Sequence, residues 1–224
     1  MSKLKRGLIV SCQAEEGSPF NAPAFIAAFA KAAELGGAVA VRLRDPENVA
    51  EVRKVTELPI IGLTKGYYES GKVLITPSMT DVNRLIDAGS DIVAIDVTKR
   101  IRLNGKTGLE FLHLVKSSVH VPIMADISTA EEALAAASAG ADYVGTTLSG
   151  YTEQSLHAND LPDFELIAAV SSKTSVPVIA EGRIWNPDQA KAAFESGAYA
   201  VCVGTAITRP VDIVKRFVSK LSPC

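Results

Sequence analysis

Hydrophobic and polar positions along the chain alternate between two patterns. Short apolar runs rich in β-branched residues are separated by longer amphipathic or alanine-rich segments, from one end of the sequence to the other. Short apolar runs are typical of buried strands, and the longer periodic segments are typical of helices. The pattern predicts eight strands, at residues 7–12, 38–43, 59–63, 91–95, 121–125, 142–145, 176–180 and 199–204. It predicts helices at residues 22–35, 46–57, 81–88, 108–117, 129–139, 163–172, 187–196 and 211–219.

Local signals mark the ends of these helices. Asp45 and Asn186 each precede a proline and are expected to be N-cap residues, because proline fits the first helical position. Residues 128–132 read Ser-Thr-Ala-Glu-Glu and predict a capping box. Glycines fall where helices should stop, at Gly36, Gly89, Gly140 and Gly197.

A two-unit repeat runs through the strands. A glycine precedes the apolar run in 37–42, 89–94, 140–145 and 197–202, whereas a proline lies within 58–62, 121–125 and 176–180. Eight strand–helix units with this repeat predict a (β/α)₈ TIM barrel in the α/β class, formed as one domain over residues 1–224. A doubly wound open sheet is the alternative, but residues 11–14 (Ser-Cys-Gln-Ala) lack the glycine-rich turn of a dinucleotide site. The longest connection, residues 66–80, predicts a small hairpin or lid at 67–75.

Composition excludes several classes of protein. The 224 residues are 47% hydrophobic and 21% charged with a net charge of −2, which indicates a globular chain without a broad basic field for nucleic acid. No apolar run approaches the roughly 20 residues of a membrane span, and the first residues lack a signal-peptide core. We therefore expect a cytoplasmic protein with neither nucleic-acid nor membrane partners.

Cysteine and histidine are too dispersed for a disulfide framework, a zinc site or a histidine-based catalytic triad. The residues concerned are Cys12, Cys202 and Cys224, and His113, His120 and His157. Cys12 lies inside a predicted strand, where a buried, unreactive thiol is expected. The sequence gives no indication of a metal or a cofactor.

Polar residues at the predicted strand ends point to chemistry, because a barrel of this kind carries its active site at the C-terminal ends of its strands. Asp126 and Glu181 each follow a strand proline by the same spacing, and Lys65 lies near the end of the third strand. Gln13 and Arg42 are expected to end the first and second strands. A lysine among carboxylates suits a general acid or base, a Schiff-base nucleophile or a ligand clamp, and a structural salt-bridge network is the alternative without chemistry.

A phosphate site is expected where the last two strands end. Glu181-Gly182-Arg183 follows the seventh strand, and Gly204 opens a segment that ends at Arg209. Barrels often bind phosphate here through glycine N–H groups and a short helix N-terminus, and a guanidinium matches a phosphate dianion. Tight turns are the alternative explanation of both glycines. The hydroxyl-rich segment 146–152 would bind a sugar or form a packed turn, and the charged segment 96–102 is expected to be a solvated loop.

Several of these segments together resemble the N-acetylmannosamine-6-phosphate 2-epimerase family. They are residues 7–13, 59–62 with Lys65, 124–129, 145–152, 178–183 and 203–209, and the resemblance covers essentially the whole chain. It implies a (β/α)₈ barrel of sialic-acid and amino-sugar catabolism. The implied reaction interconverts N-acetyl-D-mannosamine 6-phosphate and N-acetyl-D-glucosamine 6-phosphate by proton transfer at C2, without metal or nucleotide.

The resemblance also implies roles for individual residues. Lys65 would be the acid/base at C2, and Glu181 would assist it, with one-base and two-base transfer both open. The sugar would be bound by Asp126, Arg42 and Gln13, and the phosphate by Arg209 with Gly182 and Gly204. A homodimer is implied, with the last helix exchanged between subunits. The sequence departs from the family pattern at Gly66, Val97 and Leu103.

Two other functions fit the same residues. A Schiff-base lyase or aldolase would use Lys65 as a nucleophile, and borohydride would trap its substrate adduct. A regulatory barrel would bind a phosphosugar without turning it over.

Overall fold

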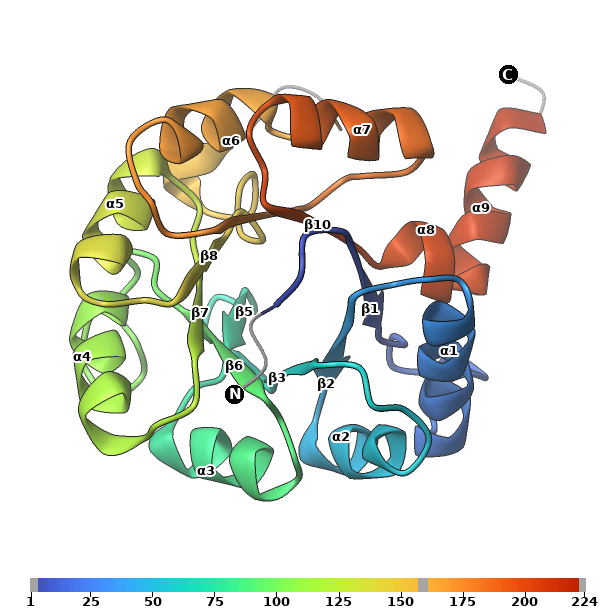
Figure 1. The fold of residues 1–224 in the computed structure, drawn as a ribbon, viewed down its shortest axis with the longest axis horizontal. Coiled ribbons are helices and arrows are strands. Elements are labelled where there is room, and N and C mark those ends of the chain that lie inside the picture. Colours follow the sequence, from blue (N-terminus) through green and yellow to red (C-terminus); the bar gives the residue numbers. More distant parts are fainter. Residues whose placement is uncertain (1–3, 157–160, 222–224) are drawn as a thin grey trace.

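The computed structural model describes residues 4–156 and 161–221, and its central feature is a closed barrel of parallel strands. The strands follow the order β1-β10-β9-β8-β7-β6-β3-β2 around the barrel, and β1 pairs with both β2 and β10 (Figure 1). Their bounds are β1 Leu8–Cys12, β2 Ala40–Arg44, β3 Ile60–Leu63, β6 Ile92–Asp96, β7 Ile123–Asp126, β8 Tyr143–Gly145, β9 Val178–Glu181 and β10 Ala200–Val203. The predicted barrel is confirmed. The open-sheet alternative is wrong because β1 pairs with β10 as well as with β2, which leaves the eight-stranded sheet without a free edge.

Helices surround the barrel in a ring (Figure 1). They are α1 Pro23–Leu35, α2 Pro46–Arg53, α3 Met79–Asp87, α4 Gly108–Ser118, α5 Ala130–Ser138, α6 Phe164–Ser171, α7 Pro187–Glu195, α8 Thr205–Thr208 and α9 Pro210–Leu221. A short 3₁₀ helix, η1 Glu153–Ser155, lies between β8 and α6. No helix in the described part of the chain is both long and apolar enough to cross a membrane.

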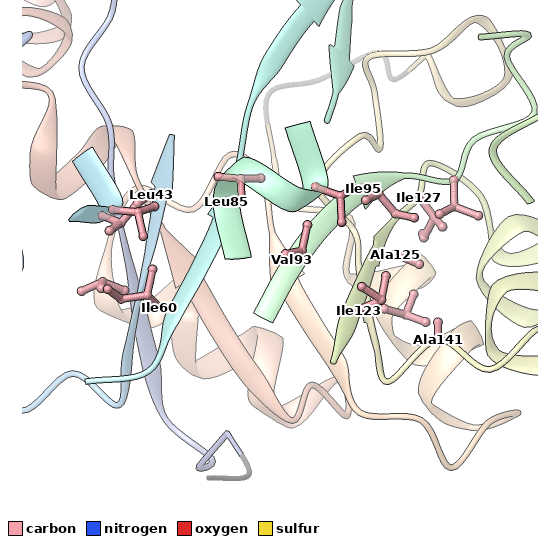
Figure 2. Close-up of a cluster of buried hydrophobic side chains, with 14 of the residues drawn as sticks. Leu43, Ile60, Leu85, Val93, Ile95, Ile123, Ala125, Ile127 and Ala141 are labelled. Atoms are coloured by element: carbon pink, nitrogen blue, oxygen red, sulfur yellow. The ribbon is translucent and has the colours of Figure 1, made fainter. Parts of the chain in front are cut away.

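The alternation of side chains along each strand builds two cores. Val10 and Cys12 of β1 belong to the layer between strands and helices, whereas Ile9 packs inside the barrel. Figure 2 shows part of the outer layer, where strand residues such as Ile123 and Ala125 meet other buried aliphatic side chains. Cys12 is fully buried there, as expected, and burial raises the pKa of its thiol to about 12.

The N-terminal segment closes the end of the barrel at which the strands begin. Leu4 is 2% exposed and packs into the interior core. Its N–H donates to the Tyr143 hydroxyl, and its carbonyl accepts from the Tyr199 hydroxyl at 2.7 Å. Because this end is sealed, the interior opens to solvent at the other end, where the strands finish.

All three predicted helix starts are present, and two of them have side-chain caps. Asn186 accepts a hydrogen bond from the backbone of Gln189, and Thr129 with Glu132 forms the expected capping box. Asp45 is the N-cap residue before Pro46, as predicted, but its side chain makes no capping bond. Its backbone is left-handed at φ 72°, and its carboxylate lies 3.1 Å from Arg44 Nε instead. The Asp45 side chain does not cap the helix because its carboxylate pairs with the charged side chain next to it.

The predicted hairpin is present between β3 and α3. Strands β4 (Lys65–Tyr67) and β5 (Val73–Ile75) pair as an antiparallel ribbon separate from the barrel. Its base is fixed at Thr76, which has a left-handed φ of 48° and whose hydroxyl donates to the Ala94 carbonyl at 2.6 Å. Lys65 is therefore the first residue of the hairpin and sits beside the barrel mouth.

The last helix departs from ordinary barrel packing. Its apolar residues recur at helical spacing, a pattern typical of a helix packed on the barrel, but α9 has no buried residue. Val214, Phe217 and Val218 are 59%, 67% and 55% exposed. In Figure 1, α9 projects beyond the ring of helices. The apolar face of this helix is therefore turned away from the barrel core.

Candidate active site

A cavity of about 520 Å³ opens at the C-terminal mouth of the barrel. That volume is within the range of sites for small molecules. Almost all of the predicted site residues line it: Gln13, Arg42, Lys65, Glu181, Gly182, Arg183, Gly204 and Arg209. Asp126 is the exception, because it is fully buried beneath the cavity.

Arg42 lies at the floor of the cavity and holds two carboxylates together. Its guanidinium forms a forked pair with Asp126, with Nη1–Oδ1 at 3.0 Å and Nη2–Oδ2 at 2.7 Å. Nη1 also lies 2.9 Å from Glu181 Oε2. Arg42 does not end its strand as expected, since β2 continues to Arg44. Its side chain is 1% exposed and reaches from β2 to strands β7 and β9.

The charges of this group shift one another's ionisation. Burial opposes the charge on Arg42, but Asp126 and Glu181 outweigh it and raise the pKa of the guanidinium. Burial raises the pKa of Glu181, and Asp126 adds to the rise, although Arg42 opposes it. One cation faces two carboxylates, so Glu181 retains a proton to higher pH than an ordinary glutamate does.

Lys65 is the second ionisable feature of the mouth. Burial lowers its pKa to about 8, with help from the charges of Arg209, Arg44 and Arg42. Among the described residues, no ion pair of Lys65 is present. Arg209 and Arg42 are residues that the sequence analysis placed at the barrel mouth, and Arg44 at the end of β2 is a third cation, which it missed. A lysine tuned in this way can carry a free amine near neutral pH.

Lys65 and Glu181 approach the cavity from opposite directions. Lys65 follows β3, and Glu181 ends β9. In the strand order, β9 and β3 are equally distant in both directions around the closed barrel. A ligand placed between them would present one face to the amine and the other to the carboxyl group.

The segment after β8 provides both packing and a cavity residue. Thr146 belongs to the packing, because its hydroxyl donates to the Glu181 carbonyl at 2.9 Å and accepts from the Glu181 N–H at 3.0 Å. Thr152 likewise donates to the Ser128 hydroxyl. Thr147 instead lines the cavity and lies between Asp126 and Glu181. The packed turn therefore accounts for Thr146 and Thr152, whereas Thr147 faces the cavity.

The end of the cavity near β9 and β10 has the features expected of an anion site. Gly182 has φ 120°, a conformation that favours glycine, and a Cβ there would meet no atom within 4 Å. Gly204 immediately precedes α8, whose first N–H groups have no partner within the helix. The guanidinium of Arg209 lies 3.8 Å from Glu15 and from Asp212, beyond hydrogen-bond distance. Hydrogen-bond donors therefore gather at this end of the cavity, and the two carboxylates near Arg209 lie too far away to accept from its guanidinium.

Arg183 is committed to the protein. Its Nε donates to the Leu161 carbonyl at 2.7 Å and its Nη1 to the Ser149 carbonyl at 2.6 Å. Its guanidinium also lies over the Tyr151 ring, 5.9 Å from the centroid. Arg183 lines the cavity, and two of its five N–H donors fix the walls of the mouth.

The segment 96–102 is not the solvated loop that was expected. Asp96 and Arg102 are 1% and 2% exposed, and Arg100 pairs with Asp96 at 2.7 Å. Arg102 donates to the carbonyls of Thr76 and Pro77 at the base of the hairpin. The prediction of a solvated loop was wrong because the carbonyl groups that accept from Arg102 belong to another segment, which the local charge pattern does not show. Arg100 also lines the cavity, and its sequence carries no signal for that role.

No group of three or more histidine, cysteine, aspartate or glutamate residues in 4–156 and 161–221 is arranged to hold a metal ion. Two residues of the sequence argument, His157 and Cys224, lie outside the described residues.

Comparisons with known proteins bear on this site. Residues 26–223 match the sequence model of a family described as "NanE: Putative N-acetylmannosamine-6-phosphate epimerase". A relative from Caldanaerobacter subterraneus subsp. tengcongensis, described in the same way as a 2-epimerase, is 51% identical over 98% of this chain and 92% of its own. One from Clostridioides difficile is 41% identical over 99% and 98%.

Solved structures agree. The structure of the N-acetylmannosamine-6-phosphate 2-epimerase from Clostridium perfringens matches with a TM-score of 0.90 at 40% identity, covering 97% of this chain and 94% of that one. A thiamine phosphate pyrophosphorylase from Pyrococcus furiosus matches with a TM-score of 0.60 at 17% identity, over 99% and 98% of the two chains. The second likeness concerns the barrel fold alone.

Proposed function

The chain belongs to the N-acetylmannosamine-6-phosphate epimerase family, and we propose that its cavity interconverts N-acetyl-D-mannosamine 6-phosphate and N-acetyl-D-glucosamine 6-phosphate. The observation that supports this most strongly is the position of Lys65 and Glu181 on opposite sides of one mouth. Epimerisation at C2 removes a proton from one face of the carbon and returns one to the other. Two opposed acid/base groups match that requirement.

Lys65 acts as the base in this proposal. With a pKa of about 8, a usable fraction of its side chain is a neutral amine at neutral pH. Nζ takes the proton at C2 of the open-chain sugar, and the C–H electron pair forms the C1=C2 bond of an enolate that carries the acetamido group at C2. Negative charge moves onto the oxygen at C1, and a proton delivered to the opposite face of C2 completes the inversion. Glu181 is the group placed for that delivery.

The cations of the mouth stabilise the developing oxyanion, because fixed charges in a site shielded from water need little reorganisation. Arg42 reaches the cavity floor, held by its forked pair with Asp126. Asp126 acts through Arg42 rather than by touching the sugar, since it is fully buried. Gln13 has a buried Oε1 without a hydrogen-bond partner and is placed to receive the acetamido N–H of the substrate.

The 6-phosphate occupies the end of the cavity at Gly182, Gly204 and Arg209. Backbone N–H groups and a forked guanidinium are good partners for a phosphate dianion. Every step uses side chains of the chain, so the proposed reaction needs neither metal nor organic cofactor. A dianionic sugar does not cross a bilayer unaided, which is why we assign the reaction to the cytoplasm.

We also propose a homodimer built on α9. Val214, Phe217 and Leu221 are 59%, 67% and 81% exposed on this projecting helix. A second copy of the chain would cover that face. Sedimentation at micromolar concentration should give a dimer for the wild-type protein and a monomer for Phe217→Glu. A monomeric wild-type protein would exclude this arrangement.

The main test is direct. Either hexosamine phosphate is mixed with the purified protein, and the anomeric NMR signals are followed in D₂O. Both sugars should appear from either starting compound, and deuterium should enter at C2. No interconversion over hours in either direction would refute the proposed function.

Two variants distinguish one-base from two-base transfer. Lys65→Ala should lose turnover with either sugar. Transfer by Lys65 alone predicts that C2 exchange is lost from both sugars, whereas paired groups predict that exchange persists from the sugar whose C2 proton faces Glu181. With paired groups, Glu181→Gln should retain exchange from the substrate whose C2 proton faces Lys65 and lose epimerisation. Equal exchange and turnover in Glu181→Gln would instead favour Lys65 alone. Absence of a borohydride-trapped adduct on Lys65 separates both from a Schiff-base lyase.

A further inference from the structure

The hydroxyl of Thr147 lies between the two carboxyl groups of the cavity floor. Its Oγ1 is 2.7 Å from Asp126 Oδ1 and 3.1 Å from Glu181 Oε2. The third contact is with Arg42 Nη1 at 3.5 Å. A hydroxyl has one hydrogen to donate, so it can serve only one of the two carboxyl groups at a time.

Distances favour Asp126 as the acceptor of that hydrogen. Asp126 also receives both arms of the Arg42 fork, at 3.0 and 2.7 Å, whereas Glu181 has one Nη1 contact at 2.9 Å. The anion with more and shorter donors is the better stabilised one. Asp126 therefore holds the negative charge that pairs with Arg42.

The remaining contact, between Thr147 and Glu181, then has a hydrogen only if Glu181 supplies it. Two oxygens 3.1 Å apart without a hydrogen between them repel each other, whereas a protonated carboxyl group would donate to the lone pair of Oγ1. The hydrogen bonds form a directed chain, from the Glu181 carboxyl group to the Thr147 hydroxyl and from that hydroxyl to Asp126.

The groups around Glu181 act on its ionisation in opposite directions. Arg42 of β2 and Lys65 of β4 favour its anion, whereas Asp126 of β7 disfavours it. Cys202 of β10 is its register partner in the sheet, and a hydrogen bond from this buried thiol favours the anion, as one donated by Thr147 would; the Thr147 hydrogen therefore has to go to Asp126 for the chain to form. Burial is the largest influence and raises the pKa of Glu181.

We propose that Thr147 is a positioning residue that keeps Glu181 protonated, by accepting its hydrogen while donating its own to Asp126. The inference rests on the proposed function for its consequence: Glu181 enters the reaction as the acid that gives a proton to C2. In that step the C1=C2 electron pair forms the new C–H bond, Glu181 is left as a carboxylate, and Lys65 already carries the proton it removed. The reverse reaction begins from that second form of the pair.

The geometry also separates Thr147 from its neighbour Thr146. Thr146 bonds to the backbone of Glu181 and would hold the strand whatever the ionisation of the side chain. Thr147 meets the carboxyl group itself. A variant of Thr147 should therefore change ionisation without loosening β9.

The test is infrared spectroscopy of the protein without substrate, so its outcome is independent of whether the sugar is epimerised. The difference spectrum between wild type and Glu181→Gln at pH 7 should contain the C=O band of a protonated carboxylic acid. In Thr147→Val, which keeps the shape but loses the hydroxyl, the pH midpoint of that band should fall by about one unit. Thr147→Ser should restore it to within a few tenths of a unit.

Two further measurements complete the design. Thermal unfolding should be similar for Thr147→Val and Thr147→Ser, which excludes a general structural defect. If the sugar is epimerised, Thr147→Val should lose roughly tenfold or more in kcat, whereas Thr147→Ser stays close to wild type. The inference is overturned if wild type lacks the acid band at pH 7, if the band belongs to Asp126, or if Thr147→Val leaves its midpoint unchanged.

Discussion

Replacing Arg42 with methionine would remove the cation that joins the two carboxyl groups of the cavity floor. Arg42, Asp126 and Glu181 have side chains that are 1%, 0% and 15% exposed, so water cannot replace the lost partner. Breaking a buried ion pair by removing one member costs about 3–5 kcal/mol. We therefore expect Arg42→Met to lower the free energy of unfolding by about that amount near pH 8.

The control is the same substitution at an exposed pair. Arg84 lies 3.0 Å from Glu47, with side chains 55% and 64% exposed. Exposed pairs contribute about 0–1 kcal/mol, so Arg84→Met should be close to wild type. In a protein of this size, the predicted loss for Arg42→Met corresponds to a fall in Tm of roughly 6–20 °C. Urea denaturation and thermal scans of the three proteins measure the difference.

The loss of unfolding free energy in Arg42→Met should also change with pH in a defined direction. Without Arg42, the folded-state pKa of Glu181 lies further above its unfolded one, because burial and the charge of Asp126 raise it and the cation that opposed them is gone. A folded state that binds extra protons loses stability as pH rises through that raised pKa. The deficit should therefore be smaller at pH 5 than at pH 8. An Arg42→Met deficit no larger than that of Arg84→Met, or one that does not grow with pH, would refute this account.

Three further predictions follow from single contacts. Because Lys65 must be a free amine, kcat/KM should rise about tenfold per pH unit below pH 8 and level off above it, as measured by the NMR assay; a flat profile from pH 6 to 9 would contradict this role. Asn186→Ala should lower the free energy of unfolding by about 1 kcal/mol in urea titrations, whereas Asp45→Ala, which removes no capping bond, should cost less. Gly145→Ala would place a methyl group 2.8 Å from Asp126 Oδ1, so kcat should fall roughly tenfold or more while the circular dichroism spectrum is retained; wild-type kcat would mean that the carboxylate moves without consequence.

The local pattern of residues was sufficient to predict the helices and strands and most of the residues that line the cavity. Strand side chains alternate, and the strands of this fold end at one mouth, so the spacing from Pro122 and Pro177 placed Asp126 and Glu181 correctly. The same rule applied to β8 would have found Thr147, two residues beyond Gly145. These features depend on short-range geometry, which a sequence records directly.

The structure corrected the sequence wherever partners lie far apart in the chain. Asp96 and Arg102 read as a solvated charge run, yet Arg102 is buried against the hairpin base. At Asp45 the departure is local: the residue is the N-cap of α2, but its carboxylate lies beside the adjacent Arg44 and makes no capping bond. Charge and capping patterns say which bonds a residue can make, and tertiary packing decides which of them it does make.

The sequence by itself determined the order of strands and helices, the residues at the strand ends and the candidate phosphate glycines. Only the tertiary structure decided that Arg42 crosses the barrel to Asp126 and Glu181 and that α9 presents its apolar face outward. It also decided the lowered pKa of Lys65, because burial and three arginines from other segments act on it together. Burial and electric field belong to the arrangement of distant residues in space, and no local pattern encodes them.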